Sequence, residues 1–194
     1  MTAAIPDDTA IDIAVIGAGP AGLAAAELLS GAGRAVHLFD AMPSVGRKFL
    51  LAGKGGLNLT HAEPFEAFAG RYGARRAALE PLLRDFGADA LRAWAADLGV
   101  ETFVGTSQRV FPTDMKAAPL LRAWLQRLRH PAAPGVPVSF HMRHRWTGWE
   151  AGDSAGALTF DTPAGPRRVR ARAVLLALGG GSWARLGSDG AWVP

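Results

Sequence analysis

The sequence of 194 residues contains 49% hydrophobic and 20% charged residues, which is typical of one folded domain rather than of a disordered chain. It contains no cysteine, which excludes disulfide scaffolds, zinc–thiolate sites and cysteine nucleophiles and is compatible with a cytoplasmic location. The net charge is only +4, and the longest stretch without a charged residue, 13–26, is shorter than the ~20 residues of a membrane span, so we expect no membrane partner.

The first forty residues predict a strand, a helix and a second strand. Residues 11–16 are rich in β-branched residues and are followed by glycine, which is typical of a buried parallel strand. Residues 20–29 are rich in alanine and leucine and begin with proline, which a helix tolerates in its first turn. Residues 35–39 predict the second strand, which ends at Asp40. This order indicates a βαβ unit.

The turn between the first strand and the helix fits the G-x-G-x-x-G pattern of dinucleotide-binding domains. Gly17 allows a tight turn, Gly19 lets the backbone approach a pyrophosphate, and Gly22 lets the helix pack closely on the sheet. The helix N-terminus offers N–H groups and the positive end of its dipole to the phosphates. Asp40 can accept hydrogen bonds from ribose hydroxyls. The combination predicts dinucleotide binding; the alternative is a glycine-rich turn that binds nothing.

Residues 44–61 are rich in glycine and show no clear periodicity, so we expect a long irregular loop. Such loops in compact domains are usually functional. The cations Arg47, Lys48 and Lys54 and the backbone N–H groups of this loop offer donors to the rest of a long cofactor. A simple NAD-binding half would continue directly into another βα unit, so the loop favours FAD.

The middle of the chain predicts helices with short extended segments between them. Residues 75–98 indicate two helices broken near Gly87, and residues 115–129 indicate a further helix with an apolar face. Between these helices, residues 102–104 predict a short strand, and residues 109–112 form a tight segment after it.

The last third changes character. Short alternating runs between 136 and 171 indicate an antiparallel β-meander, and the apolar run 173–178 indicates a return to a buried parallel strand that ends in three glycines. Four arginines, at 167, 168, 170 and 172, alternate in part with apolar residues. A basic tract can bind nucleic acid, but this alternation favours the solvent face of a strand.

The remaining residues with catalytic potential give little evidence of a further site. No histidine has metal-ligand spacing with partners, so we expect no metal. His61 closes the glycine-rich loop and is a candidate proton donor beside a reduced flavin; the alternative is a loop histidine bonded to the backbone. The sequence has neither the G-x-S-x-G elbow of serine hydrolases nor a complete P-loop.

Three motifs in this order resemble one family, the BaiN/YhiN-like flavoproteins, which are NAD(P)/FAD-dependent oxidoreductases of the aminoacetone-oxidase type. The motifs lie at 46–61, at 109–117, and at 178–183 with 187–190. The resemblance covers essentially the whole chain. It implies an α/β, Rossmann-like FAD-binding domain of the glutathione-reductase type, with FAD as cofactor and NADH or NADPH as possible reductant. Family members are about twice this length, so we expect residues 1–194 to be a truncated N-terminal part that lacks an inserted domain and a C-terminal segment closing on the flavin.

The resemblance also implies which residues bind the cofactor. They come from the glycine turn, the end of the second strand, the glycine-rich loop, the meander and the glycines after the last strand: Gly17, Ala18, Gly19, Pro20, Ala21, Gly22, Asp40, Ala41, Arg47, Lys48, Gly53, Lys54, Gly55, Gly56, Asn58, Thr60, Trp146, Ala177, Gly179 and Gly180. Many relatives have Arg-Cys where this chain has Gly56-Leu57, and a longer motif where it has 187–190. These departures indicate a distinct subfamily, so no substrate is carried over.

Three functional hypotheses follow. The first is an FAD-dependent oxidoreductase that transfers hydride or electrons to or from a small organic substrate. The second is a flavoenzyme that reduces a base in ribosomal RNA, because one branch of the family is associated with uridine reduction. The third is a truncated nucleotide-binding fragment without activity, and we expect the isolated chain to bind FAD weakly.

Overall fold

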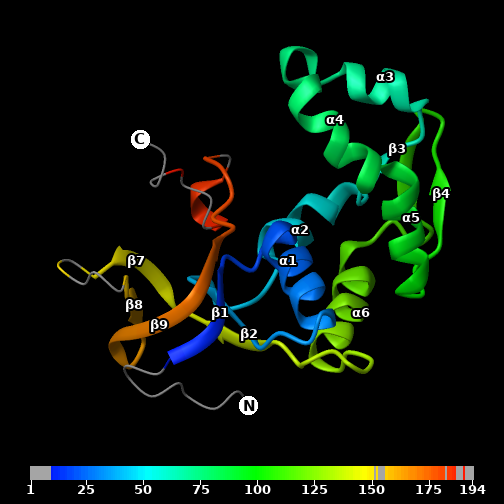
Figure 1. The fold of residues 1–194 in the computed structure, drawn as a ribbon. Coiled ribbons are helices and arrows are strands. Elements are labelled where there is room, and N and C mark those ends of the chain that lie inside the picture. Colours follow the sequence, from blue (N-terminus) through cyan, green and yellow to red (C-terminus); the bar gives the residue numbers. More distant parts are fainter. Residues whose placement is uncertain (1–9, 151, 153–155, 182, 187–189, 191–194) are drawn as a thin grey trace. The chain divides into compact units, whose positions relative to one another are not determined.

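A computed structural model describes residues 10–150, 152, 156–181, 183–186 and 190. The chain forms two compact units (Figure 1). The first unit contains residues 1–49 and 125–194, and the second contains residues 50–124. The motif at 187–189 and Ser182 lie outside the described residues. No helix in the described part of the chain is long and apolar enough to cross a membrane.

The first unit is built on a six-stranded sheet with the order β6-β2-β1-β9-β8-β7. Four strands are mutually parallel, and β8 and β7 are added in antiparallel fashion. The strands are β1 (Ala10–Ile16), β2 (Val36–Asp40), β6 (Ser139–Met142), β7 (Arg145–Trp149), β8 (Leu158–Thr162) and β9 (Gly165–Leu176). The sheet is therefore mainly parallel and carries a β-meander at one edge.

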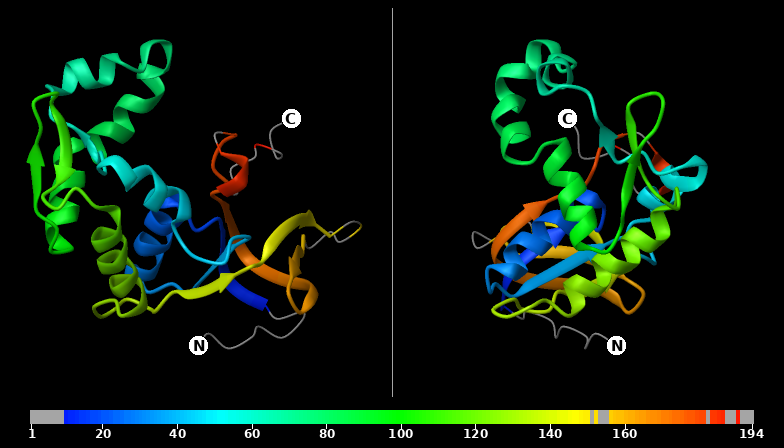
Figure 2. Two further views of the ribbon diagram at one scale, coloured as in Figure 1. Left: turned by 180° about the vertical axis from the view of Figure 1, so that it is seen from behind. Right: turned by 90° about the vertical axis from the view of Figure 1, so that its right-hand side faces the viewer.

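The predicted βαβ unit is confirmed. Helix α1 (Pro20–Gly31) connects β1 to the parallel strand β2 and buries Leu23 and Ala26 completely. The predicted return strand is also confirmed, because β9 pairs in parallel with β1 in a register that joins Ile13 to Ala173. The left view of Figure 2 shows β1 and β9 side by side.

Two features of this sheet differ from the sequence-based expectations. Residues 139–142, expected in the meander, instead form β6, a parallel neighbour of β2. Alternation of apolar and polar residues predicts a strand but not the direction of its partner, which explains the error. Furthermore, β9 is a single strand of 12 residues: 165–169 pair with β8, and 170–176 pair with β1. The meander therefore consists of β7, β8 and the first part of β9.

The core on the meander side of the sheet is a cluster of buried apolar residues from four strands: Ile11, Ala14, Ile16, Phe39, Leu158, Phe160 and Val169. The second half of β9 is less buried than predicted, since Leu175 and Leu176 are 36% and 48% exposed. β8 pairs only with the first half of β9, so within the described residues no strand covers the outer edge of the second half. The expectation of a wholly buried strand is wrong at these two leucines.

The second unit combines a small antiparallel sheet with helices. The sheet has the order β3-β5-β4, and its strands are β3 (Thr60–His61), β4 (Thr102–Val104) and β5 (Arg109–Pro112). The helices are α3 (Phe65–Gly70), α4 (Arg76–Asp85) and α5 (Ala88–Asp97), with the short 3-10 helix η2 (Gly73–Arg75). The predicted break near Gly87 is confirmed, because Gly87 separates α4 from α5.

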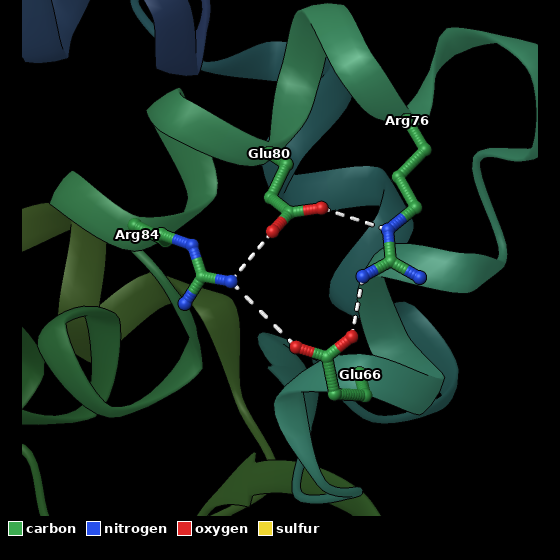
Figure 3. A network of polar contacts seen from close by, with 4 residues as sticks. All are labelled: Glu66, Arg76, Glu80 and Arg84. Carbon is green, nitrogen blue, oxygen red and sulfur yellow. Dashed lines mark hydrogen bonds and ion pairs between the residues drawn. The ribbon is translucent and has the colours of Figure 1, made fainter.

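Four charged side chains connect α3 to α4 (Figure 3). The carboxylate of Glu80 accepts a hydrogen bond from Arg76 at 2.7 Å and another from Arg84 at 2.5 Å. Glu66 of α3 pairs with the same two arginines. Hydrogen bonds from Arg76 and Arg84 lower the pKa of Glu80. The network lies at the surface, where ion pairs contribute modestly to stability.

Two helices cross the boundary between the units. Helix α2 (Arg47–Ala52) continues into the 3-10 helix η1 (Gly53–Gly55), and α6 (Ala117–Arg129) leads back into the first unit. The expected irregular loop at 44–61 is therefore wrong in part, because it contains α2, η1 and β3. In the first unit, the 3-10 helix η3 (Ala184–Leu186) follows the last strand.

Candidate nucleotide-binding site

Two of the three motif glycines are required by the packing of the backbone. Gly17 has φ +110°, and a Cβ there would lie 2.3 Å from the carbonyl oxygen of Ala177. A Cβ at Gly22 would lie 1.8 Å from the carbonyl oxygen of Gly17. The turn after β1 therefore touches both α1 and the chain after β9, and any side chain at either position would push them apart.

Gly19 is different, because neither its conformation nor its neighbours require glycine. It is the N-cap of α1 with φ −80° and ψ −178°, which any residue can adopt. A Cβ there would meet no atom within 4 Å. No side chain caps the helix, Pro20 occupies its beginning, and its first turn carries no acidic residue. The space beside Gly19 thus lies at a helix N-terminus suited to an anion.

Asp40 lies beside this turn, at the carboxyl end of β2. Its Oδ2 accepts a hydrogen bond from the backbone N–H of Ala18 at 2.6 Å, and its Oδ1 accepts one from the N–H of Met42 at 2.7 Å. The carbonyl of Ala18 accepts in turn from the N–H of Gly46 at 3.0 Å. Each carboxylate oxygen has a second lone pair, so these bonds leave Asp40 able to accept from a ribose hydroxyl as well.

The turn after β6 lies beside Asp40 and the residues that follow β2, and the sequence analysis did not predict this. Arg143 has φ +60°, and its N–H donates to the carbonyl of Met42 at 3.0 Å. The N–H of His144 donates to the carbonyl of Asp40 at 2.9 Å. No motif marks this turn, and it reaches this edge of the sheet because β6 is parallel to β2.

The chain after β9 reaches the same edge of the sheet. The N–H of Ala177 donates to the carbonyl of Ile16 at 2.8 Å, which extends the pairing with β1. Gly179 has φ +76°, and a Cβ at Gly180 would meet nothing within 4 Å. In open α/β sheets, ligands bind outside the carboxyl ends of parallel strands. The glycine turn, Asp40 and these glycines all occupy that position.

Trp146, a predicted adenine contact, lies on β7. It is partly buried against the apolar cluster and meets Trp149 edge-on, with ring centroids 5.8 Å apart. Its Nε1 is buried and has no hydrogen-bond partner among the described residues. Its role toward adenine stays a prediction.

The predicted cofactor contacts of the glycine-rich loop are divided between the two units. Arg47 and Lys48 begin α2 in the first unit, whereas the residues from Gly53 to Thr60 belong to the second unit. Asn58, Lys54 and Gly55 are exposed there. A Cβ at Gly55 would meet nothing within 4 Å.

Within the second unit, the loop packs against the 109–117 motif. A Cβ at Gly53 would lie 2.5 Å from the Cβ of Ala117, and Gly56 has φ +114° beside the side chain of Met115. The N–H of Leu57 donates to the carbonyl of Met115 at 3.0 Å. Packing within the unit therefore explains why positions 53 and 56 are glycine, without any ligand. Two motifs that are far apart in sequence form one local structure.

His61 belongs to β3 and faces a carboxylate. Its Nδ1 lies 3.4 Å from Oε1 of Glu63, and Nε of Arg71 lies 2.5 Å from the same oxygen. The imidazole therefore lies beside the carboxylate of Glu63, and its role as a proton donor stays a prediction. Among the described residues, no group of three or more potential ligands could hold a metal ion.

Comparison with solved structures places the fold among flavoprotein and oxidoreductase structures. The chain matches the open conformation of a flavocytochrome c3 fumarate reductase with a TM-score of 0.65 and 18% identity, over 90% of this chain and 34% of that chain. It matches a 3-ketosteroid-delta4-(5alpha)-dehydrogenase from Rhodococcus jostii RHA1 with a TM-score of 0.60 and 19% identity, over 90% of this chain and 47% of that one. It matches the p-nitrophenol 4-monooxygenase PnpA from Pseudomonas putida DLL-E4 with a TM-score of 0.53 and 17% identity, over 92% of this chain and 43% of that chain.

These likenesses concern the fold, and the chain spans less than half the length of each of the three proteins. A search of curated protein sequences gives no match. The model of one family, described as the HI0933-like protein Rossmann domain, matches residues 11–194. The chain therefore belongs to the HI0933-like family, and these residues form its Rossmann domain.

Proposed function

We propose that this domain binds FAD, without a covalent bond, as part of an oxidoreductase that acts on a small organic molecule. FAD, when bound, supplies the hydride or electron transfer, and the protein supplies binding, orientation and electrostatics. In this proposal NADH or NADPH is the reductant, as the family resemblance implies.

The observation that carries the proposal is the open space at Gly19. Gly17 and Gly22 are explained by contacts within the protein, but Gly19 has no such explanation. A glycine that is free of internal constraint, at an uncapped helix N-terminus, is what close approach of a pyrophosphate requires. The residues present therefore fit the diphosphate of a dinucleotide, and we assign its ribose to Asp40, whose carboxylate lies beside the same turn.

The charge of β9 favours a small-molecule substrate over RNA. Arg168 pairs with Glu150 at 2.5 Å, and Arg172 pairs with Asp12 at 3.3 Å. Two arginines of the basic tract are thus engaged within the protein, which weakens the electrostatic argument for a nucleic-acid partner.

The proposal is tested by a matched pair of glycine substitutions in α1. Gly19 and Gly31 lie at opposite ends of this helix, and a Cβ at either position would meet nothing within 4 Å. Neither alanine variant should therefore cause a clash, and we expect each to fold with a change in stability of no more than about 1 kcal/mol, which reflects the preference for glycine over alanine at an N-cap and for alanine over glycine within a helix. Gly19→Ala places a methyl group in the space assigned to the diphosphate and should weaken FAD binding by at least about tenfold, which corresponds to roughly 1.4 kcal/mol.

Gly31→Ala should leave FAD affinity unchanged. Affinity is measured by the quenching of flavin fluorescence and by calorimetry, and the fold of each variant by circular dichroism. Equal FAD affinity in the wild type and in Gly19→Ala would contradict the proposed position of the diphosphate. A wild-type chain that binds neither FAD nor ADP would contradict nucleotide binding by this domain.

A further inference from the structure

Asp40 connects three turns at the carboxyl edge of the sheet. Its side chain accepts from the N–H of Ala18, in the turn after β1, and from the N–H of Met42, in the turn after β2. Its backbone carbonyl accepts from the N–H of His144, in the turn after β6. One residue thus joins the ends of three neighbouring parallel strands, β1, β2 and β6.

The backbone of Ala18 is held by one hydrogen bond on each side of its Cα atom. Its N–H donates to Asp40 at 2.6 Å, and its carbonyl accepts from Gly46 at 3.0 Å. Ala18 itself is 1% exposed. Bonds from N–H groups to a carboxylate are charge-assisted and are stronger than bonds to a neutral acceptor. Ala18 lies between Gly17 and Gly19, and glycine has more conformational freedom than any other residue, so the two peptide groups that flank the Cα atom of Ala18 are where the turn can be fixed.

We propose that Asp40 is a positioning residue, which holds the glycine turn in the shape that binds the diphosphate. The inference rests on the proposed function and adds a role to the ribose contact expected for this acid. A ribose contact acts only through the hydroxyls of the ligand. A positioning role acts on the backbone N–H groups of the turn before any ligand binds, so it affects every ligand that carries the diphosphate.

The two roles are separated by a thermodynamic cycle between the protein and the ligand. The protein is changed by Asp40→Asn, an isosteric substitution that affects both N–H bonds: the NH₂ group cannot accept one of them, and the uncharged amide oxygen accepts the other more weakly than a carboxylate. The ligand is changed from ADP to 2′,3′-dideoxy-ADP, which lacks the ribose hydroxyls. The dissociation constants of the four combinations of protein and ligand are measured by calorimetry on the full chain. Asp12→Asn is the control, since it removes one negative charge from β1 outside the turn.

If Asp40 positions the turn, Asp40→Asn weakens binding of the dideoxy ligand on the order of tenfold, and it weakens ADP by at least the same factor because the ribose contact is lost as well. If Asp40 acts only on the ribose, the substitution weakens ADP and leaves the dideoxy ligand unchanged, and that result overturns the proposal. Asp12→Asn should change neither dissociation constant by more than about twofold, because Asp12 forms only a surface ion pair with Arg172.

Amide hydrogen exchange in the ligand-free chain gives a second readout. In Asp40→Asn, exchange at Ala18 and Met42 should accelerate by about tenfold or more, whereas exchange at Val15 in the centre of β1 should stay as in the wild type. Uniform acceleration throughout β1 would indicate general destabilisation and overturn the positioning role. Unchanged exchange at Ala18 would overturn it as well.

The exchange measurement also separates this inference from the proposed function. Local acceleration at Ala18 and Met42 in a chain that binds no ADP would support the role of Asp40 in fixing the turn and would contradict nucleotide binding. Binding of ADP together with unchanged exchange would support nucleotide binding and contradict the positioning role.

Discussion

Nδ1 of His37 lies 3.0 Å from Nε2 of His141, so two histidines on neighbouring parallel strands face one another. Their rings are stacked with centroids 5.2 Å apart, and the His141 ring also stacks on Phe39 at 4.7 Å. His141 is only 6% exposed. Burial, together with the nearby His37 and His144, lowers the pKa of His141 from 6.5 to about 4, and burial also lowers the pKa of His37.

The pair predicts a loss of stability in mild acid. Because the pKa of His141 is lower in the folded than in the unfolded chain, the unfolded chain binds more protons between pH 6.5 and 4. The contribution of neutral His141 to the free energy of unfolding is therefore fully present above pH 6.5. It decreases as the pH falls through this window, by about 3 kcal/mol in total. Urea unfolding at several pH values measures the slope of the free energy of unfolding against pH.

In that experiment, His141→Phe retains a ring against Phe39 and removes the titrating group, so it should flatten the slope. His130→Gln, at an exposed site, is the control and should keep the slope of the wild type. A slope that is the same in His141→Phe as in the wild type would assign the acid sensitivity to other groups.

Gly22→Ala should disrupt the glycine turn itself. The added Cβ would lie 1.8 Å from the carbonyl oxygen of Gly17, so α1 must move away from the turn. We expect a loss of about 3 kcal/mol, at the upper end for overpacked sites. Thermal unfolding compares this variant with Gly31→Ala, which adds the same methyl group in open space. Equal melting temperatures for the two variants would contradict the close contact.

Phe160 joins the meander to the parallel sheet and should be among the most sensitive positions of the first unit. It is 1% exposed and stacks on Phe39 with centroids 4.6 Å apart. Phe160→Ala should cost roughly 3–5 kcal/mol, as large core truncations do. Leu176→Ala, at a residue that is 48% exposed, should cost less than about 1 kcal/mol. Denaturant unfolding of both variants checks this difference.

The network of Figure 3 predicts a salt-dependent contribution of Glu80. Glu80→Gln removes the charge that both Arg76 and Arg84 contact, while Glu66 remains. The variant should melt below the wild type in low salt, and the difference should shrink at about 1 M NaCl, where surface charges are screened. A difference that persists in high salt would indicate that packing rather than charge is lost.

The sequence predicted those parts of the site that depend on local signals. Runs of apolar residues and glycine turns identified β1, β2 and the parallel part of β9, and the motif spacing placed Asp40 at the end of β2. It could not predict that Asp40 bonds to Ala18 and Met42, because any residue except proline offers a backbone N–H. The parallel pairing of β6 was missed for a similar reason, since the direction of a partner strand is set by tertiary contacts.

The shared strand β9 has a consequence for the order of folding. Its first half pairs with β8 across a tight turn, whereas its second half pairs with β1, from which it is separated by about 160 residues, as Asp12 and Arg172 are. Short loops close with a smaller loss of entropy than long ones, so we expect the β8–β9 hairpin to form before the pairing with β1. Gly17 meets Ala177 only after that late step. A nascent or partly folded chain therefore has its meander before it has a completed glycine turn.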